Sequence, residues 1–282
     1  MRVALTGHTG FIGRYVLTEL VRRGAEIIAL SRRPESASKS GKITFIPVDI
    51  QASKGVDYTS IGAPDVLIHA AWGGLPHFKS LHHIEQELPS HYAFLSALIK
   101  SGLPSLVVTG TCLEYGMQSG PLAEENPTRP VTSYGLSKDS LRKQLEILKS
   151  HHDFNFAWAR LFYLYGDGQG SKSLLPQLSD AVSRGDASFN MSGGEQLRDY
   201  LPVERVAAYI VDLAMMRANC GPVNICSGEP ISIRRLVADW LEKYGWSIKL
   251  NYGYYPYSDY EPMAFWGDDR KLKQVLQGQS SA

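Results

Sequence analysis

The sequence has few cysteines, almost no net charge and no long apolar run. Cys112, Cys220 and Cys226 are an odd set without metal-ligand spacing, which argues against a disulfide framework and a zinc site and fits a reducing cytoplasm. The 29 basic and 28 acidic residues give a formal net charge of +1. No general electrostatic field therefore attracts nucleic acid or an anionic membrane to this chain.

Segments that would direct the chain to a membrane are also lacking. No window reaches the apolar length of a membrane span, and the N-terminus enters a predicted strand without the basic region and apolar core of a signal peptide. We therefore expect a cytoplasmic protein without a membrane or nucleic-acid partner. With 282 residues, 44% of them hydrophobic, the chain can form one large domain or two that share a core.

The N-terminal segment reads as a strand, a glycine turn and a helix. Residues 3–5 are apolar, Thr6 to Gly13 has glycines spaced GxxGxxG, and apolar residues recur at helical spacing over 15–21. A helix N-terminus beside a strand end favours an anionic group, and glycines let a diphosphate approach the backbone. The segment predicts a dinucleotide site formed by Gly7, Thr9, Gly10, Phe11, Ile12 and Gly13. Tight packing is the competing interpretation of the glycines.

The ends of the next two predicted strands indicate the type of dinucleotide. The strand at 26–30 ends at Ser31-Arg32-Arg33, where an acidic residue would bind a free ribose 2′-hydroxyl and an arginine would neutralise a 2′-phosphate. This favours NADP(H), with NAD(H) possible, over the alternative that these are solvated loop arginines. The strand at 43–48 ends at Asp49-Ile50, where the carboxylate could accept from the adenine amino group.

A fourth predicted strand, at 65–69, precedes Ala70-Ala71-Trp72, whose small residues would leave room for the cofactor. We interpret His69 as a core residue because it lies within this apolar strand. His77, His82 and His83 lie in a polar loop and are predicted to be solvated, and their spacing suggests no metal site.

The alternation of strands and helices predicts the fold class. A helix at about 88–101 leads to a strand at 105–109, so we expect an α/β fold, a Rossmann-type doubly wound parallel sheet, over residues 1–165. A segment at about 199–226 would return to this domain. Residues 166–282 would mainly form a smaller substrate-binding lobe, in which the tyrosines of 252–260 line a lid or pack the lobe.

Candidate catalytic residues follow the fifth predicted strand. Thr109 and Thr111 lie at its carboxyl end, where ligands of open parallel sheets bind. Tyr134 and Lys138 are four residues apart and share a helix face. The ammonium group of Lys138 and a cationic nicotinamide would lower the pKa of Tyr134, so that this phenol could exchange a proton with a substrate oxygen held by Thr111.

These motifs resemble the extended short-chain dehydrogenases/reductases of the NAD-dependent epimerase/dehydratase family. The resemblance rests on TGxxGxxG, on Thr111 followed by Tyr115-Gly116, and on YxxxK at Tyr134 to Lys138. Residues 160–166, including Leu161, resemble the strand that carries the cofactor-side turn into the substrate lobe. Residues 198–203 resemble a segment whose arginine holds a nucleotide diphosphate, a role that the resemblance gives to Arg198. A structural Arg198–Asp199 ion pair is the competing interpretation.

Departures from the family pattern narrow the expectation. Cys112 and Leu113 stand where sugar-nucleotide dehydratases have an acid and a base, so dehydration is not expected. Tyr163 replaces an expected asparagine. The proton-relay asparagine of many relatives is missing, because the first asparagine of the chain is Asn126. The sequence TGTCLEYG, together with the paired arginines, most resembles that of reductases of 4-keto-6-deoxy sugar nucleotides.

The expected function is NADPH-dependent reduction of the 4-keto group of a nucleoside-diphosphate 4-keto-6-deoxy sugar. Thr111, Cys112, Tyr134, Tyr163 and Arg198 would contact the substrate, and Lys138 would bind the cofactor ribose. Two alternatives stay open: a C4 epimerase with retained NAD, and a non-catalytic dinucleotide-sensing protein. The resemblance also implies a homodimer through the helices at 88–101 and 134–149.

Overall fold

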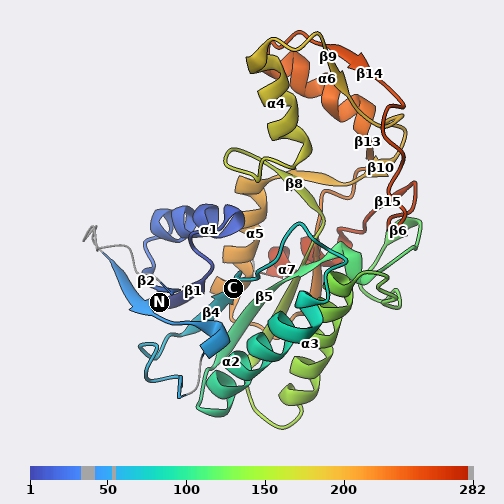
Figure 1. The fold of residues 1–282 in the computed structure, drawn as a ribbon. Helices are drawn as coiled ribbons and strands as arrows, with labels where there is room; N and C mark the ends of the chain where they lie inside the picture. The colour runs from blue at the N-terminus through green and yellow to red at the C-terminus, as the bar shows by residue number, and fades with distance from the viewer. Residues whose placement is uncertain (33–41, 53–54, 279–282) are drawn as a thin grey trace.

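A seven-stranded parallel sheet is the centre of the computed structural model, which describes residues 1–32, 42–52 and 55–278 (Figure 1). The strand order is β12-β7-β5-β4-β1-β2-β3, and each neighbouring pair is parallel. The order reverses around β1, as in Rossmann-type folds, and confirms the predicted fold class. The strands are β1 (Arg2–Thr6), β2 (Glu26–Ser31), β3 (Ile43–Pro47), β4 (Val66–His69), β5 (Ser105–Thr111), β7 (Asn155–Leu161) and β12 (Gly221–Ile225).

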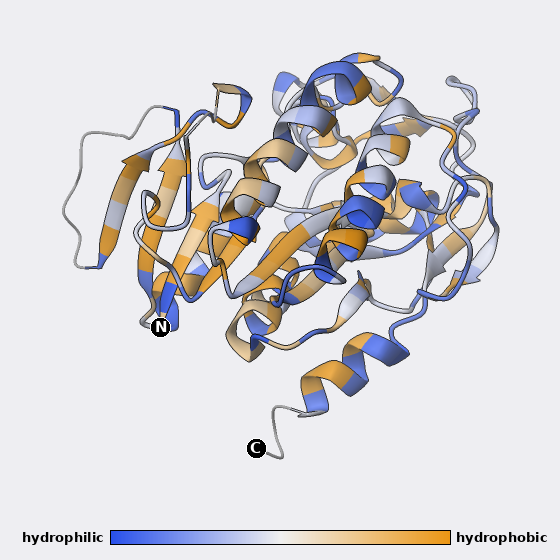
Figure 2. Ribbon diagram, turned by 90° about the horizontal axis from the view of Figure 1, so that it is seen from below, coloured by the Kyte–Doolittle hydropathy of each residue, from blue (hydrophilic) through white to orange (hydrophobic). Residues whose placement is uncertain are grey.

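Helices cover both faces of this sheet. Helices α1 (Phe11–Arg22) and α5 (Val203–Met216) pack on one face, and α2 (Leu88–Lys100) and α3 (Ser133–Lys149) pack on the other. All seven residues of β5 are buried, as expected of a parallel strand that is covered on both sides. Figure 2 shows the hydrophobic residues concentrated along the strands. The C-terminal helix α7 (Arg270–Gln277) packs beside β12.

A second group of elements lies beyond the carboxyl ends of the strands, at the top of Figure 1. Helices α4 (Leu174–Arg184) and α6 (Ile233–Tyr244) enclose an apolar cluster of their own around Leu178 and Trp240. Four two-stranded pairs lie outside the seven-stranded sheet. They are β8 (Tyr163–Tyr165) with β11 (Tyr200–Pro202), β9 (Ser188–Asn190) with β14 (Lys249–Asn251), β10 (Leu197–Arg198) with β13 (Ile231–Ser232), and β6 (Gly120–Leu122) with β15 (Phe265–Gly267).

Three short helical turns adjoin the sheet: η1 (Ile50–Ala52), the π-helical η2 (His83–Glu87) and η3 (Cys112–Glu114). Turn η2 leads into α2, so helical structure begins before the predicted start. In the part of the chain that the structure describes, no helix is long and apolar enough to cross a membrane.

The histidines differ in how well they were predicted. His69 is confirmed as a core residue, with no exposed surface, and His77 is exposed. The prediction of a solvated residue is wrong for His83, which is fully buried. Its Nδ1 accepts a hydrogen bond from the Trp72 indole at 3.1 Å, and its Nε2 contacts the carbonyl oxygen of His77 at 3.1 Å. These two contacts replace water at the ring nitrogens.

Candidate active site

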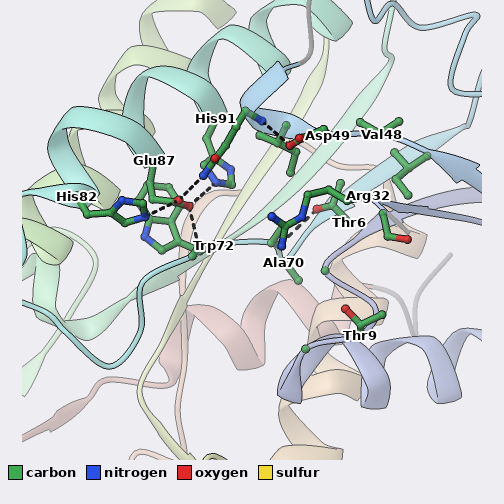
Figure 3. Close-up of a pocket in the computed structure, with 18 residues that line it drawn as sticks. Thr6, Thr9, Arg32, Val48, Asp49, Ala70, Trp72, His82, Glu87 and His91 are labelled. Atoms are coloured by element: carbon green, nitrogen blue, oxygen red, sulfur yellow. Dashed lines mark hydrogen bonds and ion pairs between the residues drawn. The ribbon is translucent and has the colours of Figure 1, made fainter. Parts of the chain in front are cut away.

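A cavity of about 370 Å³ lies at the carboxyl ends of β1, β2, β3 and β4 (Figure 3). Such cavities beside the strand that reverses the order of a parallel sheet are where dinucleotides bind. Ten of the predicted cofactor residues line it: Gly7, Thr9, Gly10, Ser31, Arg32, Asp49, Ile50, Ala70, Ala71 and Trp72. The predicted Arg33 lies outside the described residues.

The glycine turn combines close packing with an open helix end. Gly7 has a φ of +75°, and a Cβ there would lie 2.7 Å from the backbone nitrogen of Ala71. A Cβ on Gly13 would lie 1.9 Å from the carbonyl oxygen of Gly7. Close packing therefore requires glycine at positions 7 and 13. Gly10 is the N-cap of α1. Helix α1 has no side-chain cap and no acidic residue in its first turn, so its first N–H groups fit a diphosphate.

Several predicted cofactor residues lie beside the cavity and do not line it. Phe11 packs edge-on against Tyr15, with ring centroids 6.0 Å apart, and Ile12 packs against the core. Thr109 is buried in β5 beside β4, with its hydroxyl donating to the carbonyl oxygen of His69 at 3.4 Å. Leu161 is a core residue at the end of β7. Their predicted roles in cofactor binding stay predictions.

Glu87 is a cavity residue that sequence reasoning missed. Its carboxylate accepts from the backbone nitrogen of Gly73 at 2.6 Å and lies 3.0 Å from His91 Nε2 and 2.9 Å from His82 Nε2 (Figure 3). Gln51 Nε2 also donates to it, at 3.1 Å. Burial raises the pKa of Glu87, but the hydrogen bonds from His91 and Gly73 outweigh burial and lower this pKa to about 2. The spacing of Glu87 and His91, four residues apart, was a visible signal of a pair on one helix face.

His91 continues this network into the sheet. His69 Nε2 lies 2.7 Å from His91 Nδ1, and His69 Nδ1 lies 3.0 Å from the Thr6 hydroxyl. Burial lowers the pKa of His69 and of His91, with the charge of Lys138 adding to the effect. At neutral pH the His69 ring is therefore uncharged, and the hydrogen-bonded chain from Thr6 to Glu87 carries its negative charge at the carboxylate.

The predicted catalytic residues come together at the end of β5 and the start of α3. The Thr132 side chain accepts from Gly135 N at 3.0 Å and caps α3, which places Tyr134 in its first turn. The Thr111 side chain lies near enough to the Tyr134 hydroxyl to favour its ionised form. Lys138 is 1% exposed, and its Nζ donates to the carbonyl oxygen of Thr109 at 2.9 Å. The three residues predicted to act on the substrate carbonyl therefore lie together.

The pKa of Tyr134 shifts in the opposite direction to the one predicted, and the pKa of Lys138 is also shifted. Burial raises the pKa of Tyr134, Glu114 and Cys112 raise it further, and the hydrogen bond from Thr111 lowers it. The expected lowering is therefore wrong for the protein's own groups, because the phenol is nearly fully buried. Burial lowers the pKa of Lys138 to about 7, although Glu114 and Glu87 favour its charged form.

A second cavity, of about 290 Å³, lies in the upper region and includes the predicted Tyr163 and Arg198. Arg198 Nη2 forms an ion pair with Glu261 at 3.0 Å, and the Tyr163 hydroxyl donates to the same carboxylate. The alternative Arg198–Asp199 pair is wrong, because Asp199 instead accepts from the backbone N–H groups of Ser227, Gly228 and Gly267. The guanidinium of Arg198 therefore reaches the cavity.

Cys112 follows β5 and belongs to an apolar cluster against which Tyr163 packs. Its thiol also lies close enough to Tyr134 and Glu261 for their charges to interact. Burial raises the pKa of this thiol, so it stays neutral and offers a small, uncharged surface. The described residues contain no group of histidine, cysteine or acidic side chains that could hold a metal ion.

A parallel α/β sheet with a nucleotide-sized cavity at its strand ends and a Tyr–Lys pair beside it is the architecture of a dinucleotide-binding oxidoreductase. The model of the NAD dependent epimerase/dehydratase family matches residues 3–226, and the chain belongs to that family.

Individual relatives agree with this assignment. The dTDP-6-deoxy-L-talose 4-dehydrogenase (NAD(+)) of Aggregatibacter actinomycetemcomitans is 28% identical over 270 residues, which cover 95% of this chain and 99% of that protein. The dTDP-4-dehydro-6-deoxyglucose reductase of Escherichia coli is 26% identical over 255 residues, covering 83% and 79%. The structure of MoeE5 in complex with UDP-glucuronic acid and NAD has a TM-score of 0.82 at 25% identity, covering 98% of this chain and 93% of that one.

Proposed function

We propose that this protein is a nucleotide-sugar oxidoreductase that uses NADPH to reduce the 4-keto group of a nucleoside-diphosphate 4-keto-6-deoxy sugar. The observation that carries the proposal is that Tyr134 and Lys138 both lie against Trp72, a residue that lines the first cavity. One cavity suits a dinucleotide, and the other holds a buried arginine suited to a diphosphate. The names of the two relatives, which act at position 4 of dTDP-linked sugars, support the substrate class.

Each residue of the site has a chemical task in this reaction. A dihydronicotinamide, if held by the residues that line the first cavity, would supply the hydride that the carbonyl carbon needs. Tyr134 gives its hydroxyl proton to the carbonyl oxygen, so that the ketone becomes an alcohol and the phenol becomes a phenolate. The hydrogen bond from Thr111 and the charge of Lys138 favour that phenolate, which then takes a proton from solvent. Thr111 also holds the substrate oxygen in place.

The remaining residues bind the ends of the two ligands. Lys138 binds the hydroxyl groups of the cofactor ribose, and Arg198 binds the diphosphate of the sugar nucleotide. Because Arg198 already pairs with Glu261, the diphosphate must compete with this carboxylate. Tyr163 and Cys112 form the wall between the diphosphate and the reacting carbon. The neutral thiol of Cys112 supplies no acid or base, in keeping with reduction and not dehydration.

NADPH is the preferred cofactor in this proposal. Ser31 and Arg32 line the first cavity where β2 ends, and an acidic residue that would bind a free 2′-hydroxyl is missing from that strand end. NAD(H) stays possible, since the relative of 28% identity is named with NAD(+).

The proposal is tested by oxidation of NADPH and of NADH with dTDP-, CDP-, GDP- and UDP-linked 4-keto-6-deoxyhexoses. The products are identified by NMR. We expect turnover with at least one of these sugars, faster with NADPH, and a product reduced at position 4. The proposal fails if none is turned over.

The same residues could serve a C4 epimerase with retained NAD, which the family's name includes. An epimerised product without net oxidation of the cofactor, formed from a saturated sugar nucleotide, would favour that function over reduction. Net oxidation of NADPH with a 4-keto sugar nucleotide would favour reduction.

We also propose that the enzyme is a cytoplasmic homodimer that pairs through α2 and α3. The apolar side chains of Leu136 and Ile147 are exposed on α3, which supports pairing through this helix. The three cysteines are free thiols, which supports a reducing compartment. Light scattering should report twice the chain mass of 31.2 kDa, and replacement of Ile147 by Glu should give a monomer.

A further inference from the structure

Trp72 lies against both proposed catalytic side chains of α3. The Nζ atom of Lys138 is 4.1 Å from the centroid of the indole ring. The Tyr134 ring meets the indole near edge-on, at 6.1 Å and an interplanar angle of 67°. The expected role of Trp72 was a wall of the cofactor cavity, and neither contact follows from that role.

Other side chains hold the indole in this position. The His91 ring stacks on it at 4.5 Å and 25°, and the indole N–H donates to His83 at 3.1 Å. His91 is in turn hydrogen-bonded to Glu87. The Glu87 carboxylate also accepts a hydrogen bond from the backbone N–H of Gly73, the residue that follows Trp72. Rotation of the indole would break these contacts.

Lys138 needs such a partner because water hardly reaches it. An ammonium group has three donors, and the protein acceptor that the structure places on Nζ is the carbonyl oxygen of Thr109, at 2.9 Å. The side chain is 1% exposed. The negative face of an aromatic ring attracts a cation most strongly where the cation has lost its water, and tryptophan is the strongest of these rings.

We propose that Trp72 is a positioning residue that keeps the ammonium group of Lys138 charged inside the dehydrated site by holding the face of its indole ring against it. The proposal rests on the proposed function in one respect, since that function needs Lys138 charged to bind ribose and stabilise the phenolate. It assigns to Trp72 a task separate from contact with the cofactor.

Other titratable groups act on Lys138 from the elements packed around it. They are Glu87 and His83 of η2, Glu114 of η3, His91 of α2 and His69 of β4. The two carboxylates favour the charged lysine. Each carboxylate pairs with another side chain, Glu114 with Arg160 at 2.8 Å and Glu87 with His91 at 3.0 Å. Neither is therefore a direct ion-pair partner of Nζ. Besides the Thr109 carbonyl, the structure places the face of the Trp72 indole against Nζ, with the ring centroid at 4.1 Å.

The test measures the titration of Lys138 directly, without cofactor or substrate. The protein is labelled with lysine carrying ¹³C at the ε carbon, and the signal of Lys138 is assigned by its loss in Lys138→Gln. The parent signal should titrate with a midpoint at about 7. Trp72→Leu and Trp72→Met should lower the midpoint by about one pH unit, and Trp72→Phe, which keeps an aromatic face, by less than half as much.

A matched measurement connects the titration to binding. The affinity for NADPH, followed by its fluorescence, should begin to fall at a pH about one unit lower in Trp72→Leu than in the parent and in Trp72→Phe. Equal midpoints in Trp72→Leu and the parent, or an equal fall in Trp72→Leu and Trp72→Phe, would overturn the proposal. Neither outcome depends on which sugar is reduced, so this test and the substrate test fail independently.

Discussion

The two cavities of this protein are built in different ways. The first is lined by residues between Thr6 and His91, most of which follow the ends of neighbouring parallel strands, with His82, Glu87 and His91 added from the segment of η2 and α2. The second is lined by residues between Tyr163 and Glu261, which short two-stranded pairs bring together. Its charged groups are one arginine and one glutamate that already neutralise each other. The first cavity is therefore formed at the strand ends of one sheet, and the second by short segments that are far apart in the sequence.

This difference determines where a substitution acts. The Glu87 carboxylate in the first cavity is held by several donors, so cofactor binding need not displace it. The Glu261 carboxylate in the second cavity must release Arg198 when a diphosphate binds. Substitutions of Tyr134 or Lys138 should affect the chemical step. Substitutions in the second cavity should affect substrate affinity, and substitutions at the end of β2 should affect the choice of cofactor.

The largest effect is expected from Tyr134→Phe. Loss of the phenolic proton should lower kcat by about 10²- to 10⁴-fold, the range typical of general acid catalysis. The Kd for NADPH should stay within about twofold of the parent value, because the ring that packs against Trp72 is kept. Stopped-flow reduction and fluorescence titration would measure the two quantities. A parent-like kcat in this variant would remove Tyr134 from the chemistry.

Lys138→Met should stabilise the fold at neutral pH. The pKa of Lys138 falls from its usual 10.5 to about 7, so at pH 6 the folded chain bears the full cost of a buried ammonium. From the pKa difference, less the cost of leaving the Thr109 carbonyl unpaired, we expect the free energy of unfolding to rise by roughly 2 to 4 kcal/mol.

The sign of this effect follows from proton binding. Between pH 7 and 10.5 the unfolded parent holds a proton that the folded parent has lost, so the parent gains stability with rising pH and the advantage of Lys138→Met shrinks. Urea unfolding of both proteins at pH 6 and pH 9 measures it. An advantage that grows with pH would show that Lys138 is not a lysine with a depressed pKa.

In the second cavity, the double variant Arg198→Met with Glu261→Gln should raise KM for the sugar nucleotide roughly 10- to 100-fold, since a charged hydrogen-bonded pair contributes about 1.5 to 3 kcal/mol. The double variant avoids leaving a buried carboxylate without its partner. Glu261→Gln alone is the control and should leave KM equal or lower. Steady-state kinetics with either sugar or cofactor varied would separate the cavities, and an equal loss of cofactor affinity would contradict their separation.

The smallest effect is expected at the β2 end. Arg32→Ala with Arg33→Ala should raise the Kd for NADPH by roughly tenfold, about 1.4 kcal/mol, and the Kd for NADH by less than twofold. Calorimetry with both cofactors, at a fixed ionic strength, gives the comparison. Equal losses for the two cofactors would refute the preference for NADPH.

Local patterns predicted the first cavity well. The glycine turn, the strand ends and the shared helix face of Tyr134 and Lys138 depend on residues close in sequence, and the parallel sheet places strand ends side by side. Arg198 was harder, because its partner lies 63 residues away at Glu261. Its neighbour Asp199 points elsewhere, as successive residues of an extended segment do.

Tertiary packing explains the other misses. The phenol of Tyr134 is surrounded by Trp72, Phe78 and His83, so burial raises its pKa where the sequence predicted a lowered value. The contact of Trp72 with Lys138 joins β4 to α3 across the site, and no spacing rule connects residues so far apart. The sequence predicted which residues lie together at this site, but it could not show how completely their surroundings exclude water.

The central claim is that Tyr134 delivers a proton to a carbonyl at position 4 of a nucleotide sugar while the cofactor delivers a hydride. Incubation of a turned-over sugar with NADPH deuterated at the transferred position, followed by NMR of the product, tests it most directly. The account predicts deuterium at C4 of the sugar with the parent protein, and at least a hundredfold slower labelling with Tyr134→Phe. Deuterium at another carbon, or labelling at the parent rate in Tyr134→Phe, would contradict it.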